Sequence, residues 1–92
     1  MNEVDLLNYF YDELKIQKKT RDTLFITLDQ SVASKLTQKL GSEVSVDELY
    51  YYADICIANE WLERTTIDPG YRYLSMTSVG LQIAIAYQYR RK

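Results

Sequence analysis

Hydrophobic residues recur at steps of three and four along several stretches of the chain, with polar residues between them. The first repeat is Val4, Leu7, Phe10 and Leu14. This spacing places the four side chains on one face of an amphipathic helix. Similar patterns recur in three later stretches. We therefore predict helices over about residues 3–19, 28–40, 46–59 and 78–91.

Residues with short polar side chains mark where these helices begin. Asn2 can cap the first helix, because its side chain can accept a hydrogen bond from a free backbone amide. Thr27 opens the pattern TLDQ, in which Gln30 can reach back to the capping residue. Ser45 and Glu48 repeat this arrangement in SVDE. The two patterns predict capping boxes at the start of the second and third helices.

Three stretches rich in β-branched and aromatic residues lie outside the predicted helices. We predict strands over about residues 23–26, 62–67 and 71–76. Asp68, Pro69 and Gly70 separate the last two strands. Pro suits the first central position of a turn, and Gly can take the positive φ that a type II turn requires at the second. Helices with an antiparallel ribbon predict an α+β fold, and 92 residues are enough for one small domain.

The predicted order of helix, strand, helix, helix, β-ribbon and helix resembles the winged helix-turn-helix superfamily. In many members the third helix runs into Gly-aromatic-Leu-Ile, and the second ribbon strand ends in Leu-Thr-x-x-Gly. This chain has WLER from Trp61 and MTSVG from Met76 at these places. Thr77 would then cap the last helix. Gly80 would let that helix approach the ribbon closely, because glycine has no side chain. The chain departs from the pattern at Asn59, which we expect in place of glycine as the left-handed residue.

The resemblance implies that the third helix enters the major groove of DNA and that the ribbon, or wing, contacts the minor groove or the backbone. Lys35 and Lys39 lie one helical turn apart and could contact phosphates. The resemblance thus predicts a DNA-binding protein, and more narrowly a small transcriptional regulator. The candidate nucleic-acid-binding residues are Lys35, Lys39, Tyr50, Tyr51, Arg64, Tyr71 and Arg72.

The distribution of charge works against contact between the third helix and DNA. The formal net charge is −2 and the pI is about 5.0. Residues 43–63 contain no Lys or Arg, and they contain the carboxylates Glu43, Asp47, Glu48, Asp54, Glu60 and Glu63. These groups repel phosphates, which supply much of the affinity in DNA binding. The alternative is a protein-interaction module on the same scaffold, in which the acidic, tyrosine-rich third helix binds a basic partner. Both hypotheses stay open at this point.

The last predicted helix carries two apolar stripes. One consists of Leu81, Ile85 and Tyr89, and the other of Val79, Ile83, Ala86 and Tyr87. One stripe can pack on the domain, whereas leaving both in water would expose a patch that is unusual for a monomer. We therefore expect a homodimer through Leu81, Ile85 and Tyr89. The basic residues 90–92 suit the negative end of a helix, or alternatively form an arm that contacts nucleic acid.

Catalytic and metal-binding signatures are missing from the sequence. It has no His, one Cys and no Gly-rich phosphate loop, so we expect no enzyme activity, no cofactor and no metal. Cys56 shares a helical stripe with Leu49 and Ala53, and we expect it to be buried; we also expect Tyr52 to lie in the core. A single cysteine cannot form an intramolecular disulfide. The N-terminal residues lack a signal-peptide pattern, and residues 79–87 are too short an apolar run to span a bilayer. The expectation is a cytoplasmic protein away from membranes.

Overall fold

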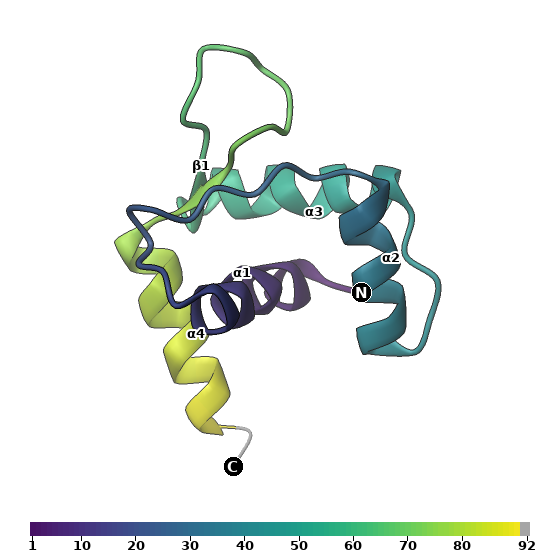
Figure 1. Ribbon diagram of the computed structural model, residues 1–92, viewed down its shortest axis with the longest axis horizontal. Helices are drawn as coiled ribbons and strands as arrows, with labels where there is room; N and C mark the ends of the chain where they lie inside the picture. Colours follow the sequence, from purple (N-terminus) through teal and green to yellow (C-terminus); the bar gives the residue numbers. More distant parts are fainter. Residues whose placement is uncertain (91–92) are drawn as a thin grey trace.

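Four helices and two short strands follow one another in residues 1–90, the part of the chain described by our computed structural model (Figure 1). They make an α+β domain with a two-stranded antiparallel sheet. The elements are α1 (Glu3–Gln17), α2 (Gln30–Leu40), α3 (Val46–Ala58), β1 (Leu62–Glu63), β2 (Ser75–Met76) and α4 (Ser78–Arg90). All four predicted helices are present, with ends that differ from the prediction by up to two residues. Residues 91–92 of the predicted basic tail lie outside the described residues.

Three of the four predicted helix caps are confirmed, at Asn2, Ser45 and Thr77. Asn2 and Ser45 each accept a hydrogen bond from the third helical residue in a reciprocal capping box. The expected cap at Thr27 is wrong, because Asp29 caps α2 by accepting from Val32 N–H at 3.1 Å. Thr27 instead accepts a hydrogen bond from the backbone N–H of Tyr73. Thr and Asp are both common capping residues, and the helix begins at Gln30, directly after Asp29 and two residues later than predicted.

The end of α3 differs from the prediction by one residue. Asn59 is right-handed, with φ of −81°, and Glu60 takes the left-handed conformation, with φ of 61°. The backbone N–H of Trp61 then donates to Cys56 O at 2.8 Å. This bond spans the turn and ties the start of β1 to the last turn of α3.

The sheet is shorter than the sequence predicts. Leu62 pairs with Met76 and Glu63 with Ser75, and these two pairs complete the ladder. The strand predicted at 23–26 is reduced to an isolated bridge between Ile26 and Leu74. Residues 64–74, hereafter the β1–β2 loop, therefore form an extended connection instead of the rest of a ribbon. Predicted strands at 62–67 and 71–76 are correct only at the ends nearest the core.

The turn predicted at residues 68–70 is also different. Gly70 does not have a positive φ, so the turn is not type II. The carboxylate of Asp68 accepts a hydrogen bond from Gly70 N–H at 2.9 Å. An aspartate side chain therefore closes this turn in place of a backbone carbonyl.

The hydrophobic core lies where α1, α3 and the short sheet meet. Leu6 and Phe10 of α1, Leu49 of α3, and Leu74 and Met76 beside and within β2 are fully buried. In Figure 1, α1 and α3 run across the molecule, with α2 near one end and α4 near the other. The β1–β2 loop projects on the side of α3 that faces away from α1. The side of α3 that faces α1 is buried in the core, so the opposite side of α3 is accessible to the β1–β2 loop and to solvent.

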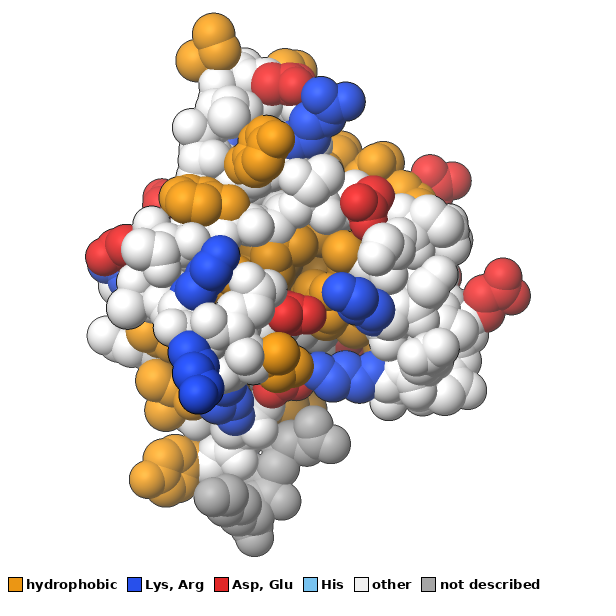
Figure 2. Space-filling view, in the orientation of Figure 1, with side chains coloured by type: hydrophobic (Ala, Val, Ile, Leu, Met, Phe, Trp, Pro, Cys, Tyr) orange, Lys and Arg blue, Asp and Glu red, His pale blue; other side chains and the backbone are white. Residues whose placement is uncertain are grey.

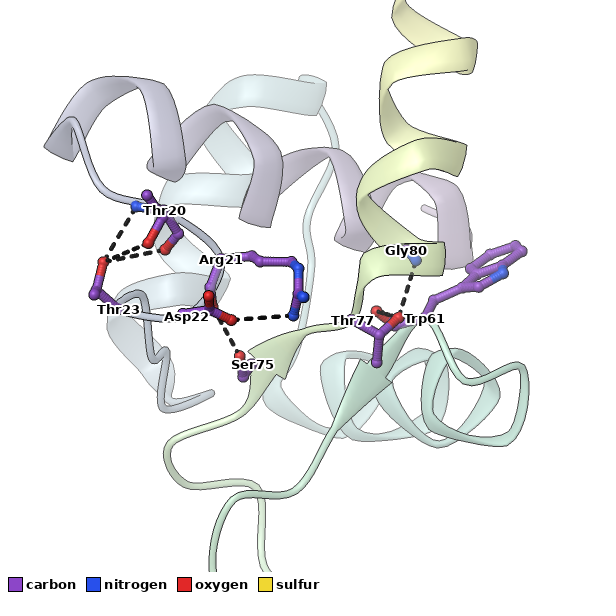
Figure 3. A network of polar contacts seen from close by, with 8 residues as sticks. All are labelled: Thr20, Arg21, Asp22, Thr23, Trp61, Ser75, Thr77 and Gly80. Carbon is purple, nitrogen blue, oxygen red and sulfur yellow. Dashed lines mark hydrogen bonds and ion pairs between the residues drawn. The ribbon is translucent and has the colours of Figure 1, made fainter.

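Thr77 and Gly80 join α4 to the end of α3 and to β1 (Figure 3). The Thr77 hydroxyl accepts from Gly80 N–H at 2.9 Å and donates to the carbonyls of Glu60 and Trp61. A Cβ added to Gly80 would lie 2.1 Å from Trp61 O. The structure therefore confirms both expectations: Thr77 caps the helix, and glycine permits the close approach.

Neither of the two predicted apolar stripes of α4 is fully buried against the domain. Gly80 and Ala84 are the buried residues of this helix. Leu81 is half-buried, whereas Ile85 is 38% exposed and Tyr89 is 75% exposed. Small residues allow α4 to lie close to its neighbours, so the larger side chains on both flanks remain in contact with solvent.

Candidate functional site

The outward side of α3 is acidic and carries an exposed tyrosine. Leu49, Ala53 and Cys56 are buried on its inner side, as expected for Cys56. The residues at steps of four and three on the opposite side, Asp47, Tyr51 and Asp54, are exposed, and Tyr51 is 63% exposed. Tyr52 is half-buried against the core, and its ring meets that of Tyr51 edge-on. The prediction that Tyr52 lies in the core is therefore correct only in part.

Tyr50 and Tyr71 bring the β1–β2 loop onto α3. Their rings are stacked, with centroids 4.1 Å apart and planes inclined by 11°. The Tyr71 hydroxyl donates to the Asp54 carboxylate at 2.9 Å. This hydrogen bond, followed by partial burial, raises the pKa of the Tyr71 phenol. The hydroxyl is thus held in its neutral, donating form.

Arg64 completes this group from the first part of the loop. Its Nε–H donates to Gly70 O at 3.2 Å, and its Nη2 lies 3.8 Å from the Asp54 carboxylate. The guanidinium carbon lies 5.5 Å from the centre of the Tyr71 ring. We call Tyr50, Asp54, Arg64 and Tyr71 the tyrosine cluster. The tyrosine cluster fixes the β1–β2 loop against α3 by contacts that are individually weak and share partners.

The remaining basic candidates lie in two other places. Arg72 is exposed and lines a hollow beside Tyr50 that also contains Asp29 and Asp68. Lys35 and Lys39 line a separate hollow between α1 and α2. Lys39 Nζ is 2.5 Å from the Asp12 carboxylate and 5.8 Å from the centre of the Tyr9 ring.

The structure therefore brings together three of the seven candidate residues, Tyr50, Arg64 and Tyr71. Tyr51 lies nearby on α3, Arg72 is farther along the loop, and the two lysines are on α2. Arg64 and Lys39 already have carboxylate partners, whereas in residues 1–90 no ion pair involves Lys35 or Arg72. The carboxylate partners of Lys39 and Arg64 are Asp12 and Asp54, and neither was among the predicted site residues. No local signal marks them, because residues 12 and 39, like residues 54 and 71, meet only in the folded chain.

Burial holds the Cys56 thiol and the Tyr9 phenol in their neutral forms. Cys56 is fully buried, its thiol donates to Glu3 O, and burial raises its pKa to about 12. Burial likewise raises the pKa of Tyr9. A thiol or phenol held neutral in this way is a poor nucleophile.

Residues 1–90 hold neither a cluster of metal-ligating side chains nor a membrane-spanning helix. No three Asp, Glu or Cys side chains come together there in positions that could hold a metal ion. None of the helices in this range combines the length and the apolar composition needed to cross a bilayer.

Comparisons of the chain with models of known protein families, with curated proteins and with solved structures found no match.

Proposed function

We propose that this domain is a winged-helix-like interaction module whose acidic α3 binds a protein partner with a basic surface. The observation that carries the proposal is the outward stripe of α3, which presents Asp47, Tyr51 and Asp54 to solvent. Arg64 lies beside Asp54, whereas no ion pair in residues 1–90 involves Asp47. Carboxylates attract a basic surface, and an exposed tyrosine adds apolar area with a polar tip. The helix order and the loop that packs beside α3 are compatible with a winged-helix layout.

The state of the basic candidates supports the same choice. Arg64 and Lys39 face carboxylates of their own chain. If DNA bound along α3, these pairs would have to be shared or broken, and the phosphates would meet Asp47 and Asp54. Neutralised phosphates are the main source of nonspecific affinity for DNA. Two of the four candidate cations are therefore already engaged by the domain, while the carboxylates on α3 remain exposed.

The second candidate function is DNA binding by a transcriptional regulator. It is favoured by the exposed positions of Lys35 and Arg72, which have no carboxylate partner in residues 1–90. These two cations would contact phosphates on either side of α3. The two functions predict opposite responses to cationic and anionic ligands, so one pair of titrations separates them.

The test is fluorescence anisotropy with two labelled probes, a Lys/Arg-rich peptide and a nonspecific DNA duplex, at low and at moderate salt. We expect the peptide to bind in a salt-dependent manner and the duplex not to bind. The double variant Asp47→Asn/Tyr51→Ala should weaken peptide binding roughly tenfold, because it removes an exposed charge and an aromatic anchor. Asp22→Asn is the matched control, since it removes one exposed carboxylate from the loop before α2.

Several results would contradict the proposal. Equal weakening by Asp22→Asn would mean that the peptide senses only the net charge. A failure of the peptide to bind at low salt would exclude the acidic face as a binding surface. Duplex binding that is lost in Lys35→Ala/Arg72→Ala would establish the DNA-binding function instead.

A further inference from the structure

A stripe along α4 is apolar over most of its length and ends in a cation. Val79, Ile83, Ala86 and Arg90 follow at steps of four, three and four, so they lie on one side of the helix. Val79 is 48% exposed and Ile83 is 37% exposed, and Ala86 and Arg90 are exposed as well. Figure 2 shows hydrophobic side chains along the edge of the molecule where Figure 1 places α4. This stripe is an apolar surface that the domain itself does not cover.

The N-terminal end of the stripe borders an acidic hollow. Val79 lines this hollow together with Ile57, Leu62, Glu60 and Glu63. Arg64 also reaches it, but its guanidinium is directed to Asp54 and Gly70. The opposite end of the stripe carries Arg90. The surface thus begins with two carboxylates, continues with aliphatic side chains and ends with a cation.

This surface is complementary to the same surface of a second chain that runs in the opposite direction, because the carboxylates at one end then meet the cation at the other. If a second α4 lies antiparallel on the first, Val79 faces the partner's Arg90 and Ile83 faces the partner's Ala86. The aliphatic stem of Arg90 can cover Val79 while its guanidinium reaches Glu60 and Glu63 of the other chain. The helix dipoles are also opposed, which is favourable. A two-fold axis repeats every contact, as in most homodimers.

We propose that the surface formed by Val79, Ile83, Ala86 and Arg90, together with Glu60 and Glu63, is a homodimer interface that takes a second copy of this chain. The proposal goes beyond the function of α3 and does not depend on it. A helix of 13 residues is only about 20 Å long. Its interface is therefore at the small end of the specific range, and we expect a dissociation constant in the micromolar range.

The stripe expected from the sequence, Leu81, Ile85 and Tyr89, is less suited to this role. Leu81 is already half-buried. Ile85 and Tyr89 line a hollow with Tyr11 and Lys15 of α1, and no carboxylate lines that hollow among the described residues. An antiparallel pair of these stripes would lack a negative group opposite its cations. Charge complementarity therefore favours the flank of α4 that carries Ile83 as the homodimer interface.

Sedimentation equilibrium of the chain and two matched variants tests the position of the interface. Ile83 and Ile85 are exposed to nearly the same extent, 37% and 38%, on opposite flanks of one helix. We expect the unmodified chain to dimerise reversibly, Ile83→Glu to be monomeric at every concentration tested, and Ile85→Glu to dimerise like the parent. A monomeric parent chain would overturn the proposal. So would dissociation of the dimer by Ile85→Glu but not by Ile83→Glu.

Charge reversal gives a second test on residues outside the core. Arg90→Glu alone, or Glu60→Arg with Glu63→Arg, should weaken the dimer by roughly fivefold or more, because each symmetric contact is lost twice. Combining the three substitutions should restore the affinity of the parent chain at low salt. Additive weakening in the combined variant would show that these groups do not meet. Circular dichroism of each variant checks that the helices are retained.

Discussion

Replacing Gly80 by alanine should destabilise the domain, although alanine is the better helix former. Gly80 does not have a positive φ, so its backbone conformation is open to alanine. The added Cβ, however, would lie 2.1 Å from Trp61 O and 2.9 Å from Trp61 C. An ordinary contact needs at least 3.4 Å, so α4 or the start of β1 has to shift by roughly 1 Å.

The size of the effect follows from three contributions. Overpacking of this kind destabilises by about 1–3 kcal/mol. Trp61 O also accepts hydrogen bonds from Thr77 N–H at 3.0 Å and from the Thr77 hydroxyl at 3.1 Å, and stretching each removes about 1 kcal/mol. The helix propensity of alanine returns about 1 kcal/mol. We expect a net loss of about 3 kcal/mol, or roughly 15 °C in Tm for a domain of this size.

Urea denaturation followed by circular dichroism measures this loss, and Gln82 provides the matched control. Gln82 is an exposed residue of the same helix. There Gln82→Ala should be more stable than Gln82→Gly by up to about 1 kcal/mol, which reports helix propensity without the clash. At position 80 we expect the reverse, with the chain that has glycine more stable to urea than the chain that has alanine. If Gly80→Ala were as stable as the parent chain or more stable, the close approach of α4 to Trp61 would be refuted.

Three further predictions concern single contacts. Thr77→Val should lower the free energy of unfolding by about 1–2 kcal/mol through loss of the helix cap, whereas Ser78→Ala, at an exposed neighbour, should change it little; urea denaturation compares the two. Cys56 has a pKa of about 12 in the folded chain against an ordinary value of 9.0, so it contributes stability below about pH 9 that is lost as the pH rises toward 12. The fall in unfolding free energy over that window should be shallower in Cys56→Ala by up to about 1.4 kcal/mol per pH unit, and equal slopes would contradict the burial of the thiol. Asp54→Ala removes the acceptor that raises the pKa of Tyr71, so NMR titration should find Tyr71 ionising at a lower pH than in the parent chain.

Local patterns were sufficient to predict the helices and their caps at Asn2, Ser45 and Thr77. A cap and an amphipathic repeat involve residues that are close in sequence, so they can be read without knowledge of the fold. The close approach at Gly80 was predictable for another reason. It was implied by the resemblance of MTSVG to Leu-Thr-x-x-Gly, in which the glycine lies in the first turn of the last helix and its lack of a side chain allows close contact with the ribbon.

Features that depend on distant residues could not be predicted in this way. The β-rich composition of residues 62–76 predicts strands, but pairing is limited to the four residues nearest the core. The second part of the β1–β2 loop is held by backbone hydrogen bonds of Leu74 and Tyr71 to residues 26 and 28. Side chains also hold the loop, and the bond from Tyr71 to Asp54 joins residues 17 positions apart. The same limit applies to Lys39, whose partner Asp12 lies on another helix. For the candidate site, sequence reasoning found the basic and aromatic residues and missed the carboxylates that engage them.

The central claim is that the acidic outward side of α3 binds a basic protein surface. The most direct measurement is a pair of ¹H–¹⁵N correlation titrations of the labelled chain, one with the Lys/Arg-rich peptide and one with the nonspecific duplex. We predict saturable shifts with the peptide that centre on Asp47 and Tyr51, and no saturable shifts with the duplex. Saturable shifts of α3 and the β1–β2 loop with the duplex, and none with the peptide, would contradict the claim.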